Sequence, residues 1–195
     1  MLKVLVIVCV NIILVGAKSA EKANNLTKSD DKMVLIAKFH QNDYKLNFER
    51  IDLVYFRKQY LQHFNIVTFK YNRTSAVINA TWTFHVDVGY DHNVIVQAYR
   101  FASNEYRLFP IRLQLNVCDA IKGNVIGLGN VIHCGNCTGC PFSKNERLRV
   151  CNWSPDEAYF PPLVPNGKYM MDMQGLFRTS EMYLARIYFT IYRPI

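Results

Sequence analysis

Three cysteines and a glycosylation sequon share the segment Cys134-Gly-Asn-Cys-Thr-Gly-Cys140. Thiols separated by two residues could bind zinc or carry out redox chemistry in a reducing compartment, or form disulfides in an oxidising one. The sequon Asn136-Cys137-Thr138 favours the oxidising compartment, because glycans are added to asparagine in the secretory pathway. The chemistry of these thiols therefore depends on whether the chain is secreted.

A short apolar stretch near the N-terminus predicts secretion. Lys3 precedes a run from Val4 to Val15 that only Asn11 interrupts, and Gly16 and Ala17 supply small residues for cleavage. The run is too short to span a bilayer comfortably. We predict a signal peptide over residues 1–17, with a cut after residue 20 as an alternative, and an extracellular protein. An uncleaved anchor is the other interpretation of this stretch.

The length that remains after the leader predicts one domain. Residues 18–32 are polar and aperiodic, as in a mobile tail, and residues 33–195 suit a single domain. The formal net charge of +8 is spread along the chain without a basic run. Nucleic acid is therefore not an expected partner. A basic surface could favour anionic lipid headgroups in transient membrane contact, but ordinary solubility explains the charge more simply.

Sequons recur along the chain and agree with secretion. The predicted glycosylation sites are Asn25, Asn72, Asn79 and Asn136, whereas the sequon at Asn152 is weakened by Pro155.

The clearest element is an alternating strand from Ile78 to Val88. Apolar side chains occupy every second position, and Asn79, Thr81 and Thr83 fall between them. This period of two predicts a half-buried strand with Asn79 on its solvent face. A turn at residues 89–91 follows, and the alternation of residues 94–98 predicts the return arm of a hairpin.

Further strands follow from the same pattern. Residues 111–117 alternate and lead into Cys118, and residues 169–173 and 185–191 are expected to pair across residues 178–181. Residues 45–56 and 65–71 are additional strand candidates, and residues 119–128 are the best helix candidate, weakened by two glycines. We predict an all-β fold, an antiparallel two-sheet sandwich of the immunoglobulin-like kind with a short helix or irregular crossover after Cys118. An up-and-down barrel is the alternative.

No enzymatic motif is found. The chain has no nucleophile elbow, zinc-protease helix, phosphate loop or dinucleotide fingerprint, and its five histidines show no ligand spacing. A Cys134 nucleophile activated by His133 is disfavoured, because neighbours on a strand point to opposite faces and the thiol is expected to be oxidised. We therefore predict no catalysis, no metal and no cofactor, and keep a hydrolase as a minor alternative.

Aromatic side chains are abundant, with twelve Phe, twelve Tyr and two Trp. They could fill the core of a sandwich, or line a cavity for an apolar ligand if the two sheets splay apart. Composition does not choose between these interpretations.

Three segments carry a resemblance to a known family. They are the run from Tyr106 to Asp119, the run from Gly139 to Phe142, and Phe160-Pro-Pro-Leu-Val-Pro-Asn-Gly-Lys-Tyr169. With them the chain from about Asn72 to Ile195 resembles a large insect family of secreted proteins of unknown function. That family is similar to the ML-type lipid-recognition sandwiches, which include the lysosomal ganglioside activator and the CheB proteins of pheromone perception.

The resemblance implies a disulfide pattern. It joins Cys118 to Cys140, and Cys134, Cys137 and Cys151 are additions to the simpler pattern. The second expected bond joins Cys137 to Cys151 and leaves Cys134 unpaired. Spacing alone leaves the connectivity open.

The resemblance also implies a non-catalytic carrier in chemosensation or lipid transport, which holds a lipid or small apolar molecule between its sheets. The expected cavity-wall residues are Trp82, Phe84, Val86, Phe109, Phe142, Tyr169, Met171 and Phe189. The alternative is an extracellular interaction module with a filled core, whose basic surface or spare thiol engages a receptor or another secreted protein.

Overall fold

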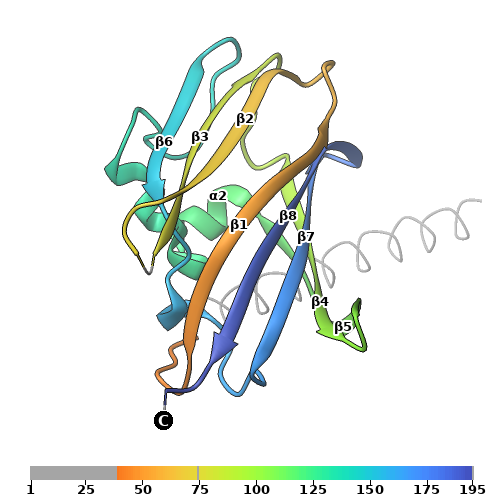
Figure 1. The fold of residues 1–195 in the computed structure, drawn as a ribbon. Helices are drawn as coiled ribbons and strands as arrows, with labels where there is room; N and C mark the ends of the chain where they lie inside the picture. Colours follow the sequence, from red (N-terminus) through yellow and green to blue (C-terminus); the bar gives the residue numbers. More distant parts are fainter. Residues whose placement is uncertain (1–38, 74, 195) are drawn as a thin grey trace, which may run out of the picture. The chain divides into compact units, whose positions relative to one another are not determined.

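Antiparallel strands in two sheets form the framework of the protein (Figure 1). The computed structural model describes residues 39–73 and 75–194. The predicted signal peptide, the polar tail and the Asn25 sequon lie outside the described residues.

The larger sheet has five strands in the order β1-β8-β7-β4-β5. Their bounds are β1 Lys45–Phe56, β4 His92–Ala102, β5 Glu105–Asn116, β7 Gly167–Phe177 and β8 Ser180–Tyr192. The smaller sheet has the order β2-β3-β6, with β2 Leu61–Lys70, β3 Ala76–Phe84 and β6 Arg147–Trp153. The predicted two-sheet antiparallel sandwich is confirmed, and apolar residues from both sheets form one buried cluster between them.

Strands β7 and β8 form the hairpin that the sequence predicted. Tyr169 lies opposite Phe189, and Met173 lies opposite Ala185. Cross-strand neighbours share a face of the sheet, so these side chains point into the sandwich together. The β4–β5 hairpin turns at Ser103 and Asn104, which both have positive φ, as a tight two-residue turn requires.

The hairpin predicted between residues 78–88 and 94–98 was wrong. Strand β3 ends at Phe84, and the chain then crosses to the other sheet before β4 begins at His92. On the way, Val88 forms an isolated bridge with Phe142. The alternation gave the inward face of each segment correctly, but a local pattern does not say which sheet a strand joins.

The outer face of β3 is also less exposed than its alternation predicted. Thr83 is only 7% exposed. It lies between His63 of β2 and Arg147 of β6, whose longer side chains flank it on the neighbouring strands.

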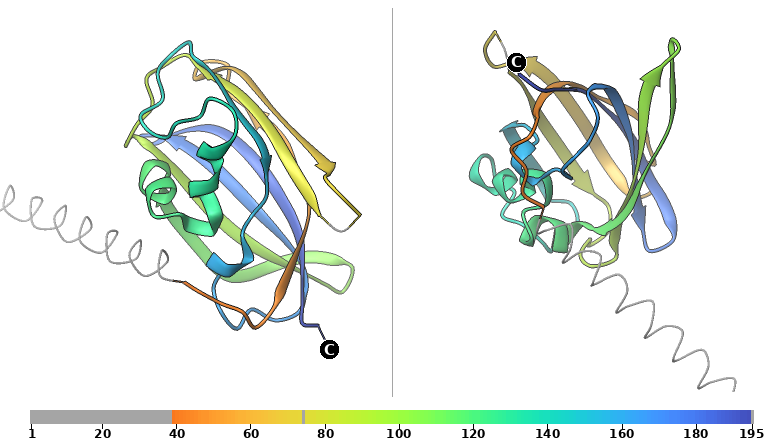
Figure 2. Two further views of the ribbon diagram at one scale, coloured as in Figure 1. Left: turned by 90° about the vertical axis from the view of Figure 1, so that its left-hand side faces the viewer. Right: turned by 90° about the horizontal axis from the view of Figure 1, so that it is seen from below.

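A helical crossover covers one side of the sandwich (Figure 2). It contains α2, Val117–Lys122, and the 3-10 segment η1, Val125–His133; the short 3-10 turn η2, Glu157–Tyr159, packs beside η1. The helix candidate of the sequence is therefore divided into two pieces. Gly123 and Asn124 separate the pieces, and Asn124 has φ +51°. Gly127 marks a kink inside η1, since it has φ +82° and a Cβ there would lie 2.8 Å from the Cβ of Asp156.

Candidate ligand cavity

An apolar cavity of about 220 Å³ lies between the two sheets. Residues of both sheets form most of its wall: Ile51, Leu61, Phe64, Ile66, Ile78, Ala80, Trp82, Phe84, His92, Val94, Val96, Leu115, Val150, Trp153, Met173, Tyr183 and Ile187. Phe142, from the segment that precedes β6, also lines it. Ala80 lies at the centre of the smaller sheet, opposite Ile66 on β2 and Val150 on β6. Its small side chain leaves space where a larger residue would fill the interior.

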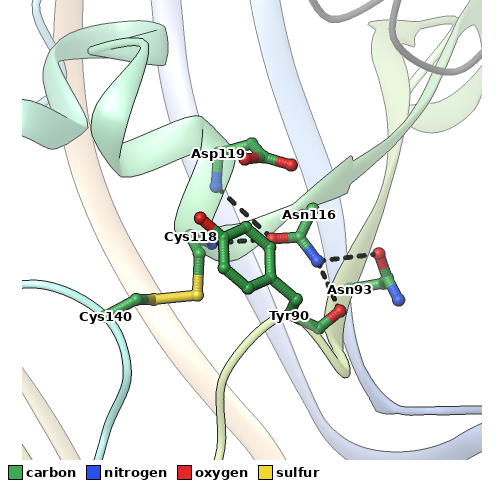
Figure 3. Close-up of a disulfide and its surroundings, with 6 residues drawn as sticks. All are labelled: Tyr90, Asn93, Asn116, Cys118, Asp119 and Cys140. Atoms are coloured by element: carbon green, nitrogen blue, oxygen red, sulfur yellow. Dashed lines mark hydrogen bonds between the residues drawn. A yellow bond between two sulfur atoms is a disulfide. The ribbon is translucent and has the colours of Figure 1, made fainter.

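The crossover closes the remaining side of the cavity. It contributes Val117, Ala120, Ile121, Ile126, Leu128, Val131 and Cys137 to the wall. The crossover begins at a defined point, because Asn116 Oδ1 accepts hydrogen bonds from the backbone N–H groups of Cys118 and Asp119 and so caps α2. Asn116 Nδ2 also donates to the carbonyl oxygen of Tyr90, which ties the start of the helix to the loop before β4 (Figure 3).

Two disulfides fix the crossover to the sandwich. Cys118 of α2 is bonded to Cys140, as the resemblance implied, with their Cα atoms 5.4 Å apart (Figure 3). Cys134, which follows η1, is bonded to Cys151 of β6, also with a Cα separation of 5.4 Å. The wall that the crossover supplies is therefore held near both of its ends by covalent bonds.

The second disulfide differs from the expected one. Cys134, which was expected to remain unpaired, takes the place assigned to Cys137 as the partner of Cys151. Cys137 is the free thiol instead, and it is 2% exposed in the cavity wall. Burial raises the pKa of this thiol. The pairing has a geometric basis: Gly135 bridges Val150, and Asn136 bonds the backbone of Arg149, so the start of the cysteine segment runs beside β6.

Three of the eight expected wall residues line the cavity. These are Trp82, Phe84 and Phe142, and the ring of Phe142 lies 6.4 Å from that of Trp82 and 6.0 Å from that of Phe84. The other five, Val86, Phe109, Tyr169, Met171 and Phe189, do not line it. They pack elsewhere in the same core, because an inward direction along a strand does not determine whether the space opposite is occupied.

Four aromatic rings occupy the space that was expected to be open. Tyr169 stacks on Phe189 with ring centres 5.6 Å apart, and Phe109 and Phe160 pack edge-on against this pair. The proline-rich segment before β7 also contributes here, since the hydroxyl of Tyr169 donates to the carbonyl oxygen of Pro165. We refer to Phe109, Phe160, Tyr169 and Phe189 as the filled region.

Sequence reasoning missed a polar pair in the cavity wall. His92, at the start of β4, lies with Nε2 3.2 Å from the hydroxyl oxygen of Tyr183 on β8. Both residues are buried, and burial lowers the pKa of His92 to about 4 and raises the pKa of Tyr183. The sequence contained a signal for this pair, because alternate residues of a strand point to the same face. His92 alternates with the inward Val94 and Val96, and Tyr183 alternates with the inward Ala185 and Ile187.

Gly175 gives Tyr183 its place beside His92. The two residues are directly opposed on β7 and β8, and a Cβ at position 175 would lie 2.2 Å from the Tyr183 ring. The ring therefore lies across the glycine, where any larger residue would displace it.

The described sequons lie on or near the surface. Asn72 and Asn136 are exposed and Asn79 is half-buried. Asn79 Oδ1 accepts a hydrogen bond from the backbone N–H of Asn152, and Asn136 Nδ2 donates to the carbonyl oxygen of Arg147. Glycosylation at these positions stays a prediction.

The described residues bear on the metal, thiol and membrane interpretations of the sequence. Within residues 39–73 and 75–194, no group of three or more His, Cys, Asp or Glu side chains is placed to hold a metal ion. Cys134 is in a disulfide and so is not available as a thiol nucleophile. No helix in this part of the chain is long and apolar enough to cross a membrane.

A protein-family model matches the central segment of the chain. Residues 93–171 match the family described as a protein of unknown function, DUF1091. This confirms the predicted resemblance for a segment that runs from β4 through the crossover into β7. The matched segment therefore supplies much of the cavity wall and all five cysteines of the disulfide-bonded region.

A solved structure is also similar. It is a Niemann-Pick type C2 protein from Japanese carpenter ant, with 11% sequence identity, coverage of 77% of this chain and 96% of that chain, and a TM-score of 0.30. No curated protein matches the chain. The sandwich and its cavity are defined by the strand pairing and the lining residues of this chain.

Proposed function

We propose that the protein is a secreted, non-catalytic carrier that holds a small apolar molecule between its two sheets. The observation that supports this proposal is the cavity of about 220 Å³, whose wall contains no Lys, Arg, Asp or Glu side chain among the described residues. Secretion is supported by the apolar N-terminal stretch of the sequence and by the two disulfides, which persist in oxidising compartments.

The volume indicates the size of the ligand. An engineered apolar cavity of about 150 Å³ binds benzene, whereas pockets for drug-sized ligands span roughly 300–1,000 Å³. A cavity of about 220 Å³ falls between these values. A single ring or a short chain suits it better than a sterol or a long-chain lipid, which would require the sheets to part further.

Burial of the ligand would supply the affinity. Each buried methylene contributes about 0.8 kcal/mol to the binding free energy. The translational and rotational entropy that the ligand loses on binding opposes this gain. The disulfides reduce the cost of ordering the crossover, since they hold this part of the wall in place before the ligand arrives. Such a carrier would act in chemosensation or lipid transport, with a receptor as a further partner, only transient membrane contact and no role in binding nucleic acid.

The alternative of an interaction module that uses a spare thiol is less well supported. The free cysteine is Cys137, and it faces the cavity with 2% of its surface exposed. A disulfide to another protein would require the wall to open.

Native mass spectrometry of the secreted protein tests the proposal. We expect a non-covalent adduct that organic extraction releases as a small apolar compound. The variant Ala80→Leu should lose the adduct while remaining folded, because the larger side chain fills the cavity. The control Ala185→Leu changes a buried alanine of β8 that does not line the cavity, and its folded fraction should retain the adduct. An empty wild-type protein, or an adduct that Ala80→Leu retains, would contradict the proposal.

A further inference from the structure

The cavity wall contains one buried polar pair whose hydrogen bonding is incomplete. His92 is 4% exposed and Tyr183 is 7% exposed, and both line the cavity. Nε2 of His92 and the hydroxyl of Tyr183 share one hydrogen bond of 3.2 Å. The ring of His92 also packs edge-to-face against the rings of Phe84 and Tyr183, with ring centres 6.1 Å and 5.9 Å away.

The second ring nitrogen of His92 has no hydrogen-bond partner in the part of the chain that the structure describes. Among the described residues, two buried side-chain atoms lack a hydrogen bond, Asp43 Oδ1 and His92 Nδ1. The carboxylate of Asp43 is still compensated, because its other oxygen pairs with Arg193 at 2.7 Å. His92 Nδ1 is therefore the unsatisfied atom in the cavity wall, and a buried polar atom without a partner is destabilising.

A count of protons shows what the pair can offer. Neutral histidine has one N–H and tyrosine has one O–H, and a single hydrogen bond between them uses one of these protons. In either tautomer of His92 one donor is left over. It is on Nδ1 if Tyr183 donates to the ring, and on the Tyr183 hydroxyl if the ring donates to Tyr183.

The pair is also uncharged near neutral pH. Desolvation lowers the pKa of His92 to about 4, so the ring carries no charge there. The wall supplies no Lys or Arg to balance an anionic ligand. A carboxylate would therefore lose its hydration without gaining a counter-charge.

We propose that His92 and Tyr183 form the polar recognition site of the cavity, and that it selects an uncharged apolar molecule carrying one hydrogen-bonding oxygen, a hydroxyl or a carbonyl. This inference rests on the proposed function and names the chemical class of its ligand. The oxygen accepts the donor that the pair has left over, and the hydrocarbon part fills the apolar remainder of the cavity. Hydrocarbons without oxygen and ionised fatty acids are the ligands that the site disfavours.

Two ligands of similar shape test the site. Octan-1-ol has the hydroxyl, and nonane has a methyl group in its place. Their dissociation constants are measured by NMR titration of cavity methyl resonances in the full mature chain, together with that of octanoate at pH 7. We expect octanoate to bind at least tenfold more weakly than octan-1-ol.

The informative variant is His92→Phe combined with Tyr183→Phe. Replacing both partners by apolar rings of similar shape leaves no unpaired group, so the fold should be retained. We expect octan-1-ol to bind about tenfold more weakly to this variant and nonane to bind within twofold of the wild-type value. Tyr169→Phe is the matched control, because its hydroxyl bonds to Pro165 in the filled region, and it should change neither ligand.

The outcomes separate this site from the carrier function. If the double variant binds both ligands as the wild-type protein does, the polar site is overturned while the carrier function stands. If the wild-type protein binds neither octan-1-ol nor nonane, both are overturned. A ¹⁵N resonance of His92 Nδ1 that shifts with octan-1-ol and not with nonane would support the site directly.

Discussion

The open cavity and the filled region lie in the same sandwich but differ in how their space and polar groups are used. The inner face of β7 carries Tyr169 in the filled region and Met173 in the cavity wall, only four residues apart. In the filled region, aromatic rings meet one another and the proline-rich segment. Around the cavity, the small residues Ala80, Ala120 and Gly175 leave the space unfilled or allow a ring to lie flat.

The polar groups differ in the same way. The hydroxyls of Tyr44 and Tyr169 are buried near the proline-rich segment and donate to the carbonyl oxygens of Pro161 and Pro165. In the cavity wall, His92 Nδ1 has no partner among the described residues. Under the proposed function, the filled region serves stability and the cavity serves binding, although both have aromatic walls.

The largest expected effect comes from truncating an aromatic ring in the filled region. Phe189→Ala should reduce the free energy of unfolding by about 3–5 kcal/mol, because it removes buried surface and leaves a new void. Phe142→Ala should cost less, since part of the Phe142 ring already borders the cavity. Denaturant unfolding of both variants measures the difference. Equal losses would show that the two regions are packed alike.

Acid should destabilise the cavity side through His92. The pKa of His92 is about 4 in the folded protein and about 6.5 when unfolded, so below pH 6.5 the unfolded chain takes up a proton that the folded protein does not. The free energy of unfolding should therefore fall between pH 6.5 and 4, by up to about 3 kcal/mol.

This pH effect is measured by denaturant unfolding across that range. The double variant His92→Phe/Tyr183→Phe should lose most of the slope. The control His85→Gln, at an exposed position, should keep it. A slope that the double variant retains would assign the acid sensitivity to other groups.

Enlarging a buried side chain should destabilise the protein where the core is filled and should be tolerated where the side chain borders the cavity. Ala185→Leu should cost about 1–3 kcal/mol, because Ala185 is fully buried at a position that does not line the cavity. Ala80→Leu should cost less than about 1 kcal/mol or increase stability, because it fills existing space. Thermal unfolding of both variants provides the comparison, and a larger loss for Ala80→Leu would mean that the cavity is not available volume.

Much of the fold could be predicted from the period of the sequence. The strand candidate at residues 45–56 coincides with β1, and the β7–β8 hairpin was predicted with its pairing. Alternation succeeds here because each strand buries one face. The partner of β3 could not be predicted in this way, since the turn residues before β4 are compatible with either a hairpin or a change of sheet.

The site was less predictable than the fold. Trp82 and Tyr169 are both aromatic residues at inward positions of an alternating strand. Trp82 lines the cavity, whereas Tyr169 is stacked on Phe189. What separates them is the volume of residues distant in the sequence, such as Ala80 and Phe160. Val86 illustrates a second limit, because β3 ends before it and the alternation no longer applies.

The most direct test is a crystal structure of the protein under xenon pressure, because xenon enters apolar cavities and reports free volume by position. The account predicts xenon density bordered by Ala80, Met173 and Ile187, and none between Tyr169 and Phe189. Loss of that density in Ala80→Leu would complete the test. A wild-type crystal without xenon between the sheets, or with xenon in the filled region, would contradict the account.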